Sequence, residues 1–388
     1  MSFLDLTGEV VKKIVTYRSM KDLIVKPDYT SLNLSSLRAT LLKMLGLEPR
    51  GSSLYEMEPF KGPLEDLFKH QSRRLLLLLV DSLNLNLLSD LLAHLESLGG
   101  GYGKILKGFV TSTFPSVTPT ALMTLYTGLP PLAHGIVGFE FYYGAMDRIV
   151  NPFKLDSDMV FLKDIFGSFD SLFEEAARSR IGVCAYVPKE LVSNPATHQM
   201  LNKARIFGYR SLLDVSGLIA GVRNAKLIYV YFSKLDETLH REGSASHKIG
   251  RILREILTLV RHSLKNGFIM VLLSDHSFID VDKKVNVKTG RGIASNGGRV
   301  IYLYNEERGH LRFRNGEKES FECFSRDRLI GEGWFGEGEC FERVGETVLI
   351  AKGRVVLTHK GKESKDKAAH GGFLFEEMIA PLAIISPP

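Results

Sequence analysis

The sequence predicts an α/β fold built on a doubly wound, mostly parallel sheet, with a smaller α+β insertion and a helical N-terminal extension. Unbroken apolar runs recur along the chain, in "RRLLLLLVDS", "LIYVYFSKLDETLH", "GFIMVLLSDHS" and "EEMIAPLAIIS". Continuous runs of this length are typical of strands buried on both faces. Helical patterns such as "LNLLSDLLAHLESLG" and "HKIGRILREILTLVRHSL" lie between them, and this alternation is typical of a parallel sheet covered by helices.

Three regions are distinguished along the chain. Residues 1–68 are expected to form the helical extension, because "NLSSLRATLLKMLGLEP" has apolar residues at helical spacing and a Gly and a Pro near its end. Residues 69–304 and 363–388 are expected to form the core. Between them, residues 305–362 alternate short strand-like runs with turns, so we expect an α+β insertion there.

The composition is that of an ordinary globular protein. Of the 388 residues, 44% are hydrophobic and 24% are charged, and the formal charge of +6 is too small to predict specific nucleic-acid binding. The longest strictly apolar run, Leu75–Val80, is far shorter than the ~18 residues of a membrane span. The first residues do not resemble a secretory signal, so we expect a cytoplasmic protein. The sequence does not indicate an oligomeric state.

Three acidic residues follow buried apolar runs: Asp81, Asp236 and Asp275. A single Asp after a strand is commonly a turn former or a helix cap. In open α/β sheets, however, ligands bind beyond the carboxyl ends of the strands, where residues from several strands converge. Three acids in this position therefore favour a common site.

Three histidines accompany these acids. His240 follows Asp236 by four residues, which places both side chains on one side of a helical turn. His276 follows Asp275 directly, and His370 precedes two glycines. Carboxylate and imidazole ligands suit zinc, with manganese as the alternative. Two divalent ions with about three protein ligands each form the two-metal arrangement used in phosphoryl transfer.

A segment rich in hydroxyl groups, "FPSVTPTALMTLYTGLPP", offers a candidate nucleophile. Pro119 is typical of the first position of a helix, and the apolar pattern then runs to Tyr126, with Gly128 just beyond. Thr118 is therefore expected to be the N-cap. Its hydroxyl would lie at a helix N-terminus, which attracts anions such as phosphate, and from this pattern alone it is either a plain cap or a nucleophile.

With these residues in place, the sequence resembles the alkaline phosphatase superfamily, and within it the type I phosphodiesterase and nucleotide pyrophosphatase family. The motifs "LVDS", "SVTPTALMTLYTGLPPLAHGIVG", "DETLH", "SDH" and "HGG" occur in the family's order, from about residue 73 to the end. In that superfamily the nucleophile lies nine residues before the Thr of a "TG" pair, here Thr127, which identifies Thr118. A Thr at this position argues against the sulfatase branch.

The resemblance also implies a metal set. One zinc ion is expected at Asp236, His240 and His370. The other is expected at Asp81, Asp275 and His276, with Thr118 bound to it. Thr118 is then expected to attack phosphorus in line, form a phosphothreonine and leave net retention at phosphorus after water hydrolyses it.

One position departs from the family's pattern. The nucleotide pyrophosphatases usually carry an Asn twenty-one residues after the nucleophile, and this chain has Phe139 there. A nonbridging phosphate oxygen then needs another donor, or the substrate differs. Tyr142 and Tyr143 are candidates for the leaving-group side, although an aromatic core strand is the favoured interpretation of "FEFYY". His134 is expected to order its own loop.

The predicted function is a two-zinc phosphohydrolase that cleaves phosphodiester or pyrophosphate bonds of a small, nucleotide-like substrate through a phosphothreonine. A phosphomonoesterase or phosphonate hydrolase on the same metals is a second hypothesis. A third is a phosphatase-like accessory protein in a multi-protein system, as in phage-defence proteins that share the "HGG" ending.

Overall fold

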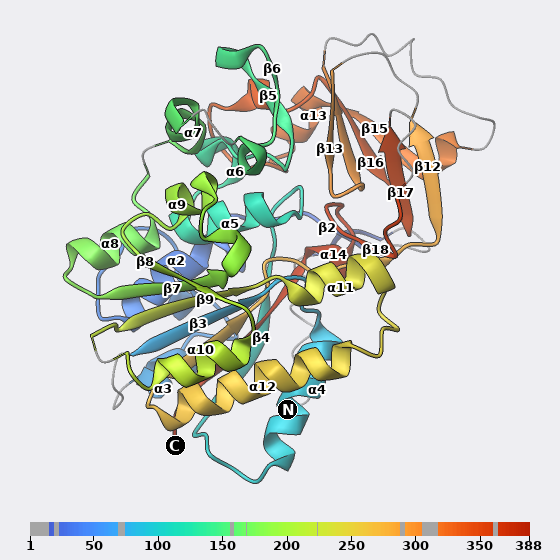
Figure 1. Ribbon diagram of the computed structural model, residues 1–388. Helices are drawn as coiled ribbons and strands as arrows, with labels where there is room; N and C mark the ends of the chain where they lie inside the picture. Colours follow the sequence, from blue (N-terminus) through green and yellow to red (C-terminus); the bar gives the residue numbers. More distant parts are fainter. Residues whose placement is uncertain are drawn as a thin grey trace.

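The computed structural model describes residues 15–18, 23–68, 74–155, 159–167, 169–222, 224–287, 292–304, 317–359 and 364–388. A seven-stranded sheet forms its centre (Figure 1). In spatial order the strands are β4 (Ile105–Thr111), β19 (Ile379–Ile385), β10 (Ile269–Leu273), β3 (Leu75–Val80), β9 (Leu227–Phe232), β7 (Val183–Pro188) and β8 (Arg205–Tyr209).

The sheet is mostly parallel, as predicted. Five strands pair in parallel with one another, in the order β10, β3, β9, β7 and β8. β19 is antiparallel to both β10 and β4, so β4 again runs with the others. The start of β19 therefore lies at the same edge of the sheet as the ends of the parallel strands.

Both faces of the sheet are covered, which explains the unbroken apolar runs. All six residues of β3 are buried, and successive side chains enter different clusters: Leu75, Leu77 and Leu79 enter one, and Leu76, Leu78 and Val80 the other. The first cluster packs against α2 (Ser35–Met44), α5 (Thr118–Thr127) and α8 (Leu172–Arg178). The second packs against α4 (Leu85–Ser97), α10 (Leu212–Ile219) and α12 (Ile249–Lys265), drawn below the sheet in Figure 1. Each fully buried Leu contributes about 1.5–3 kcal/mol.

The N-terminal region is not wholly helical. It has α2 and α3 (Pro63–Phe68), the short η1 (Leu54–Glu56) and, ahead of them, the paired strands β1 (Val15–Arg18) and β2 (Leu23–Val25). Such short strands carry too few residues for a clear alternating pattern. Asn33 in this region is fully buried, and its amide donates to the carbonyls of Thr111 (3.1 Å) and Ser112 (2.9 Å). The N-terminal region thus supports the loop between β4 and α5.

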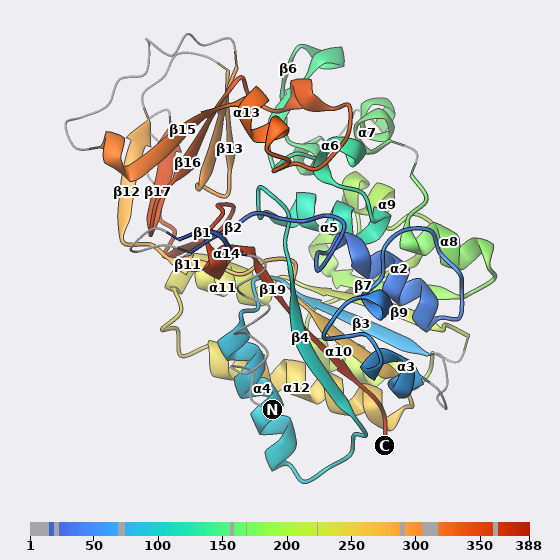
Figure 2. The ribbon, with the colours of Figure 1, turned by 180° about the vertical axis from the view of Figure 1, so that it is seen from behind.

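A second lobe is built on an antiparallel sheet of four strands, in the order β13 (Ile293–Asn296), β14 (Val300–Leu303), β16 (Thr347–Ala351) and β15 (Phe321–Ser325) (Figure 2). Beside it, β12 (Lys283–Val287) pairs with β17 (Val355–His359), and α13 (Arg326–Gly331) follows β15. β12, β13 and β14 precede residue 305, where we expected the insertion to start. The apolar run of β14 pairs with β16, from Val300↔Ile350 onward, so these strands belong with the later ones.

A buried ion pair ties this lobe to the core. Arg299, between β13 and β14, contacts Glu377 at 2.9 Å (Nε to Oε1) and 3.0 Å (Nη2 to Oε2), and both side chains are fully buried. Glu377 Oε1 also accepts from the backbone N–H of Gly372 at 2.8 Å. Removing one partner would leave an unpaired buried charge, which costs about 3–5 kcal/mol. The pair therefore fixes the loop that carries His370.

The remaining elements are short. Above the sheet edge lie α6 (Pro131–His134), the hairpin β5 (Phe141–Tyr143) and β6 (Arg148–Val150), α7 (Met159–Phe166) and α9 (Pro195–Met200) (Figure 1). α11 (Lys234–Glu242) follows β9, β11 (Ile279–Asp280) pairs with β18 (Ala368–Ala369), and α14 is Phe375–Met378. None of the helices in the described ranges is both long and apolar enough to cross a membrane.

Candidate active site

The predicted ligands converge at one edge of the central sheet. Asp81 directly follows β3, and Asp275 and His276 follow β10 after Ser274. Asp236 and His240 lie on α11, just past β9. His370 lies between β18 and β19, and because β19 is antiparallel, its start brings His370 to the same edge. All six candidates identified in the sequence are thus at one site.

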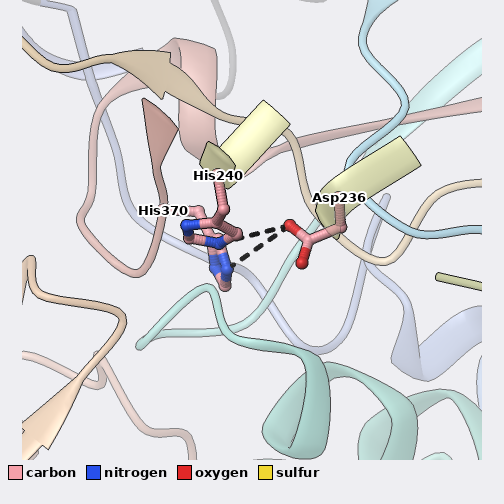
Figure 3. A group of neighbouring side chains, drawn as sticks. All are labelled: Asp236, His240 and His370. Carbon is pink, nitrogen blue, oxygen red and sulfur yellow. Dashed lines mark ion pairs between the residues drawn. The ribbon is translucent and has the colours of Figure 1, made fainter. Parts of the chain in front are cut away.

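The first group consists of Asp236, His240 and His370 (Figure 3). Nε2 of His240 lies 3.4 Å from Oδ1 of Asp236, and Nε2 of His370 lies 3.8 Å from the same oxygen. Three potential metal-ligand side chains from two separate chain segments therefore point at one position.

The second group consists of Asp81, Asp275 and His276. Nε2 of His276 lies 3.4 Å from Oδ1 of Asp81 and 3.3 Å from Oδ2 of Asp275, and the three side chains are at most 3% exposed. The rings of His276 and His370 are stacked, with centroids 3.8 Å apart. The two groups therefore lie side by side.

Backbone carbonyls fix the tautomers of two histidines. Nδ1 of His276 lies 3.2 Å from the carbonyl oxygen of Ser277, and Nδ1 of His370 lies 2.9 Å from that of Ser116. A carbonyl oxygen only accepts, so we assign the ring proton to Nδ1 in both cases. Nε2 then presents a lone pair to the carboxylates, as a metal ligand does.

Burial shifts the pKa values in this second group in opposite directions. It raises the pKa of Asp275 to about 7 and, with the charges of Asp275 and Asp236, the pKa of Asp81 well above its usual range. It lowers the pKa of His276 to about 4 and, in the adjoining first group, that of His370 to about 3. Neutral imidazoles cannot balance the charge of ionised carboxylates, so the second group contains no positive partner of its own.

The unpaired carboxylate oxygens mark the position that a cation would occupy. Within the described part of the chain, Oδ1 of Asp81 and both side-chain oxygens of Asp275 are buried without a hydrogen-bond partner. Buried ionised carboxylates are costly unless a cation compensates them. Three carboxylates and three imidazoles in two adjoining groups fit two divalent ions that accept nitrogen and oxygen ligands.

Asp366 is a neighbour of His240 that the sequence did not single out. Its Oδ1 lies 3.6 Å from Nδ1 of His240, and the N–H of Lys367 donates to the carbonyl of His240 at 2.7 Å. Although burial opposes it, Asp236 and Asp366 raise the pKa of His240 to about 10. Asp366 lies far from His240 in the sequence, so no local spacing signals the contact.

Thr118 is the first residue of α5, and Val117 precedes it in an extended conformation. The prediction that Thr118 is the N-cap is therefore wrong by one residue, because Pro is tolerated throughout the first turn, where N–H groups have no helical partner. Oγ1 of Thr118 lies 3.4 Å from Oδ2 of Asp81 and 3.2 Å from Nε2 of His276. Its hydroxyl thus faces the second group.

The neighbouring hydroxyls mostly hold the segment in place. Ser112 donates to the carbonyl of Asp275 (2.6 Å), Ser116 to that of Gly372 (2.9 Å), and Thr111 to that of Leu32 (3.0 Å). Thr113 donates to the carbonyl of Pro115 at 3.0 Å. The loop before Thr118 is thereby bound to the loop that carries Asp275 and to the loop that carries His370.

A cavity of about 260 Å³ opens beside Thr118. Its wall is largely apolar and aromatic, and it includes Asp81, Thr118 and Asp236. It is lined by Asp81, Thr118, Pro119, Leu122, Tyr126, Phe139, Phe153, Val187, Leu191, Thr197, Met200, Leu201, Tyr229, Tyr231, Ser233 and Asp236. Tyr231, which the sequence did not indicate, donates to Oδ2 of Asp81 at 2.6 Å.

Of the three candidate substrate residues, only Phe139 lines this cavity, with its ring centroid 6.5 Å from that of His370. Tyr142 and Tyr143 lie in β5, paired with β6. The hydroxyl of Tyr142 donates to Asp147 at 2.7 Å, and Tyr143 is buried. The pairing of this hairpin therefore keeps both tyrosines away from the cavity wall.

His134 orders its loop, as expected. Its Nδ1 accepts from the N–H of Ile136 at 3.1 Å, so Nε2 carries the proton and donates to Thr124 Oγ1 at 2.9 Å. Burial, with Arg343 nearby, lowers the pKa of His134 to about 3. The ring is neutral and fully hydrogen-bonded.

The α/β fold, the two acid–histidine groups and a match to a family model together define a metal-dependent hydrolase. The family model described as "Type I phosphodiesterase / nucleotide pyrophosphatase" matches residues 75–373. The chain therefore belongs to this family. No curated protein sequence matches it significantly.

Solved structures share the fold at low sequence identity. Human ectonucleotide pyrophosphatase/phosphodiesterase 5 superposes with a TM-score of 0.61 at 15% identity, covering 81% of this chain and 88% of its own. An inactive variant of the murine protein in complex with AMP gives 0.59, at the same identity and coverage. Phosphonoacetate hydrolase from Sinorhizobium meliloti gives 0.57 at 12% identity, covering 80% of this chain and 89% of its own.

Proposed function

We propose that the chain hydrolyses phosphodiester or pyrophosphate bonds of a small nucleotide-like substrate, with Thr118 as the nucleophile. The observation that carries this proposal is the position of Thr118, whose hydroxyl faces the second group and which lines a largely apolar cavity. The six ligands would hold two divalent ions, and their oxygen and nitrogen donors favour zinc.

When bound, such ions supply Lewis-acid activation of the hydroxyl and stabilise charge on the leaving oxygen. Oγ1 of Thr118 forms a bond to phosphorus while the bond to the leaving alkoxide or phosphate oxygen breaks. The hydroxyl proton passes to solvent, and a leaving alkoxide takes up a proton from solvent. Water then hydrolyses the phosphothreonine. Two in-line displacements leave the configuration at phosphorus unchanged.

The N-terminus of α5 supports the phosphate. The first N–H groups of a helix have no helical partner, and the helix dipole is positive at this end. The N–H of Ala121 donates to the carbonyl of Val117 and so begins the helical hydrogen-bond pattern. The N–H of Thr120, one residue earlier, therefore belongs to the groups without a helical partner. These N–H groups provide the hydrogen-bond donor to a nonbridging phosphate oxygen that the Phe139 side chain cannot provide.

The cavity wall favours a diester over a monoester. Every lining residue belongs to the described part of the chain, and none of them is Lys or Arg. A diester carries one negative charge and a second organic group, which the apolar wall can accept. A flat base such as that of AMP, which the murine relative binds, is a group of this kind. A monoester dianion would place a charged oxygen where the diester has its second organic group, against a wall without Lys or Arg.

This preference predicts a rate difference. A diester of a chromogenic phenol should be hydrolysed at least about tenfold faster than the monoester of the same phenol, because an uncompensated charge costs more than about 1.4 kcal/mol. The comparison uses kcat/KM for both compounds, and a chelator should abolish both rates. Faster hydrolysis of the monoester, or of a phosphonate, would contradict the diester assignment.

A further inference from the structure

Ser82 has a backbone conformation that is unusual for its residue type. It directly follows Asp81, a member of the second group, and it is fully buried with φ at 63°. A residue with a Cβ atom is disfavoured in this left-handed region, which glycine adopts freely. Such a conformation persists where its surroundings hold it, and it is found preferentially at functional sites.

The side chain of Ser82 reaches the first group. Its Oγ donates to Oδ1 of Asp236 at 2.7 Å, and Oγ lies 3.4 Å from Nδ1 of His276, whose proton faces the carbonyl of Ser277. Ser82 therefore bridges the groups: it is bonded to Asp81 through the backbone and to Asp236 through its hydroxyl.

The oxygen that accepts from Ser82 is the one that faces the ligand histidines. Oδ1 of Asp236 lies 3.4 Å from Nε2 of His240 and 3.8 Å from Nε2 of His370. A carboxylate oxygen has two lone pairs. One is taken by Ser82, which leaves the other directed toward the position between the histidines.

We propose that Ser82 is a positioning residue that orients the Asp236 carboxylate for the ion of the first group. The inference rests on the proposed two-metal site. Partners that orient metal-binding carboxylates typically contribute 10–100-fold in metal affinity. The left-handed conformation is the means by which a residue next to one ligand reaches a ligand of the other group.

Zinc titration of the metal-free protein tests this inference. Wild type, Ser82→Gly and Ser82→Ala are compared by calorimetry with a competing chelator, and the weakened site is identified by its anomalous signal in crystals at limiting zinc. Both variants should bind the ion beside Asp236 about 10–100-fold more weakly and the ion beside Asp275 as wild type does.

Two controls separate orientation from folding. Glycine adopts φ 63° without strain, so metal-free Ser82→Gly should melt no lower than metal-free Ser82→Ala, although both lose affinity. Ser263 is also fully buried, but it donates to the carbonyl of Leu259 in α12 at 2.7 Å. Ser263→Ala should bind both ions with wild-type affinity.

Wild-type affinity in Ser82→Gly would overturn the role of Ser82 and leave the two-metal site intact. Weaker binding in Ser82→Ala alone would also overturn it, because the hydroxyl is absent from both variants. Fewer than two ions in wild type would instead contradict the proposed function.

Discussion

Thr118→Ala should lose diester hydrolysis by about 10³-fold or more while the protein still binds two zinc ions. The variant keeps all six Asp and His ligands and removes only the hydroxyl that faces the second group. The measurements are kcat/KM on the chromogenic diester and zinc content after dialysis.

Thr120→Ala is the matched control. Thr120 lies two residues further along α5, and its buried hydroxyl has no hydrogen-bond partner among the described residues. This variant removes only the hydroxyl and keeps the backbone N–H of residue 120, so it should keep activity within a few-fold of wild type. If Thr118→Ala remained within tenfold of wild type, Thr118 would not be the nucleophile, and if it lost its zinc, the comparison would show a ligand role instead.

Asp275→Asn should have opposite effects on the metal-free and the metal-bound protein. At pH 8 the metal-free wild type must ionise a carboxyl group whose pKa burial raises to about 7 and whose oxygens have no partner within the described residues. An amide removes that cost, so the metal-free variant should melt at a higher temperature than metal-free wild type.

Zinc should then reverse the order of the two melting temperatures. An ion at 1,000 times its Kd stabilises the folded state by about 4 kcal/mol, and the variant should lose this contribution at the second group, together with its activity. Asp90→Asn, at an exposed position of α4, should respond to zinc as wild type does. Two results would contradict this role of Asp275: a metal-free Asp275→Asn that melts lower than metal-free wild type, or an increase in its melting temperature with zinc as large as that of wild type.

The grouping of the six candidate ligands could be predicted from the sequence because most of them lie next to an element that the sequence marks clearly. Asp81 and Asp275 follow strands of unbroken apolar residues, and His240 lies one helical turn after Asp236. Once the sheet is parallel, its topology brings the ends of these strands to one edge. Physical pattern and family resemblance therefore identify the same residues.

The residues that surround the ligands could not be found in this way. Asp366 and Tyr231 contact ligands that lie 126 and 150 positions away in the chain. Their roles depend on tertiary packing, which leaves no periodic trace. The start of the second sheet lies before residue 305, because β14 pairs with β16 on the far side of that residue and β13 pairs with β14.

We propose that the two groups of acidic and histidine side chains hold two divalent ions beside Thr118. Anomalous scattering from crystals grown with zinc is the decisive measurement. We expect two peaks, one between Asp236, His240 and His370 and the other between Asp81, Asp275 and His276, about 3.5–4 Å apart. A single peak, or zinc bound only away from these six side chains, would contradict it.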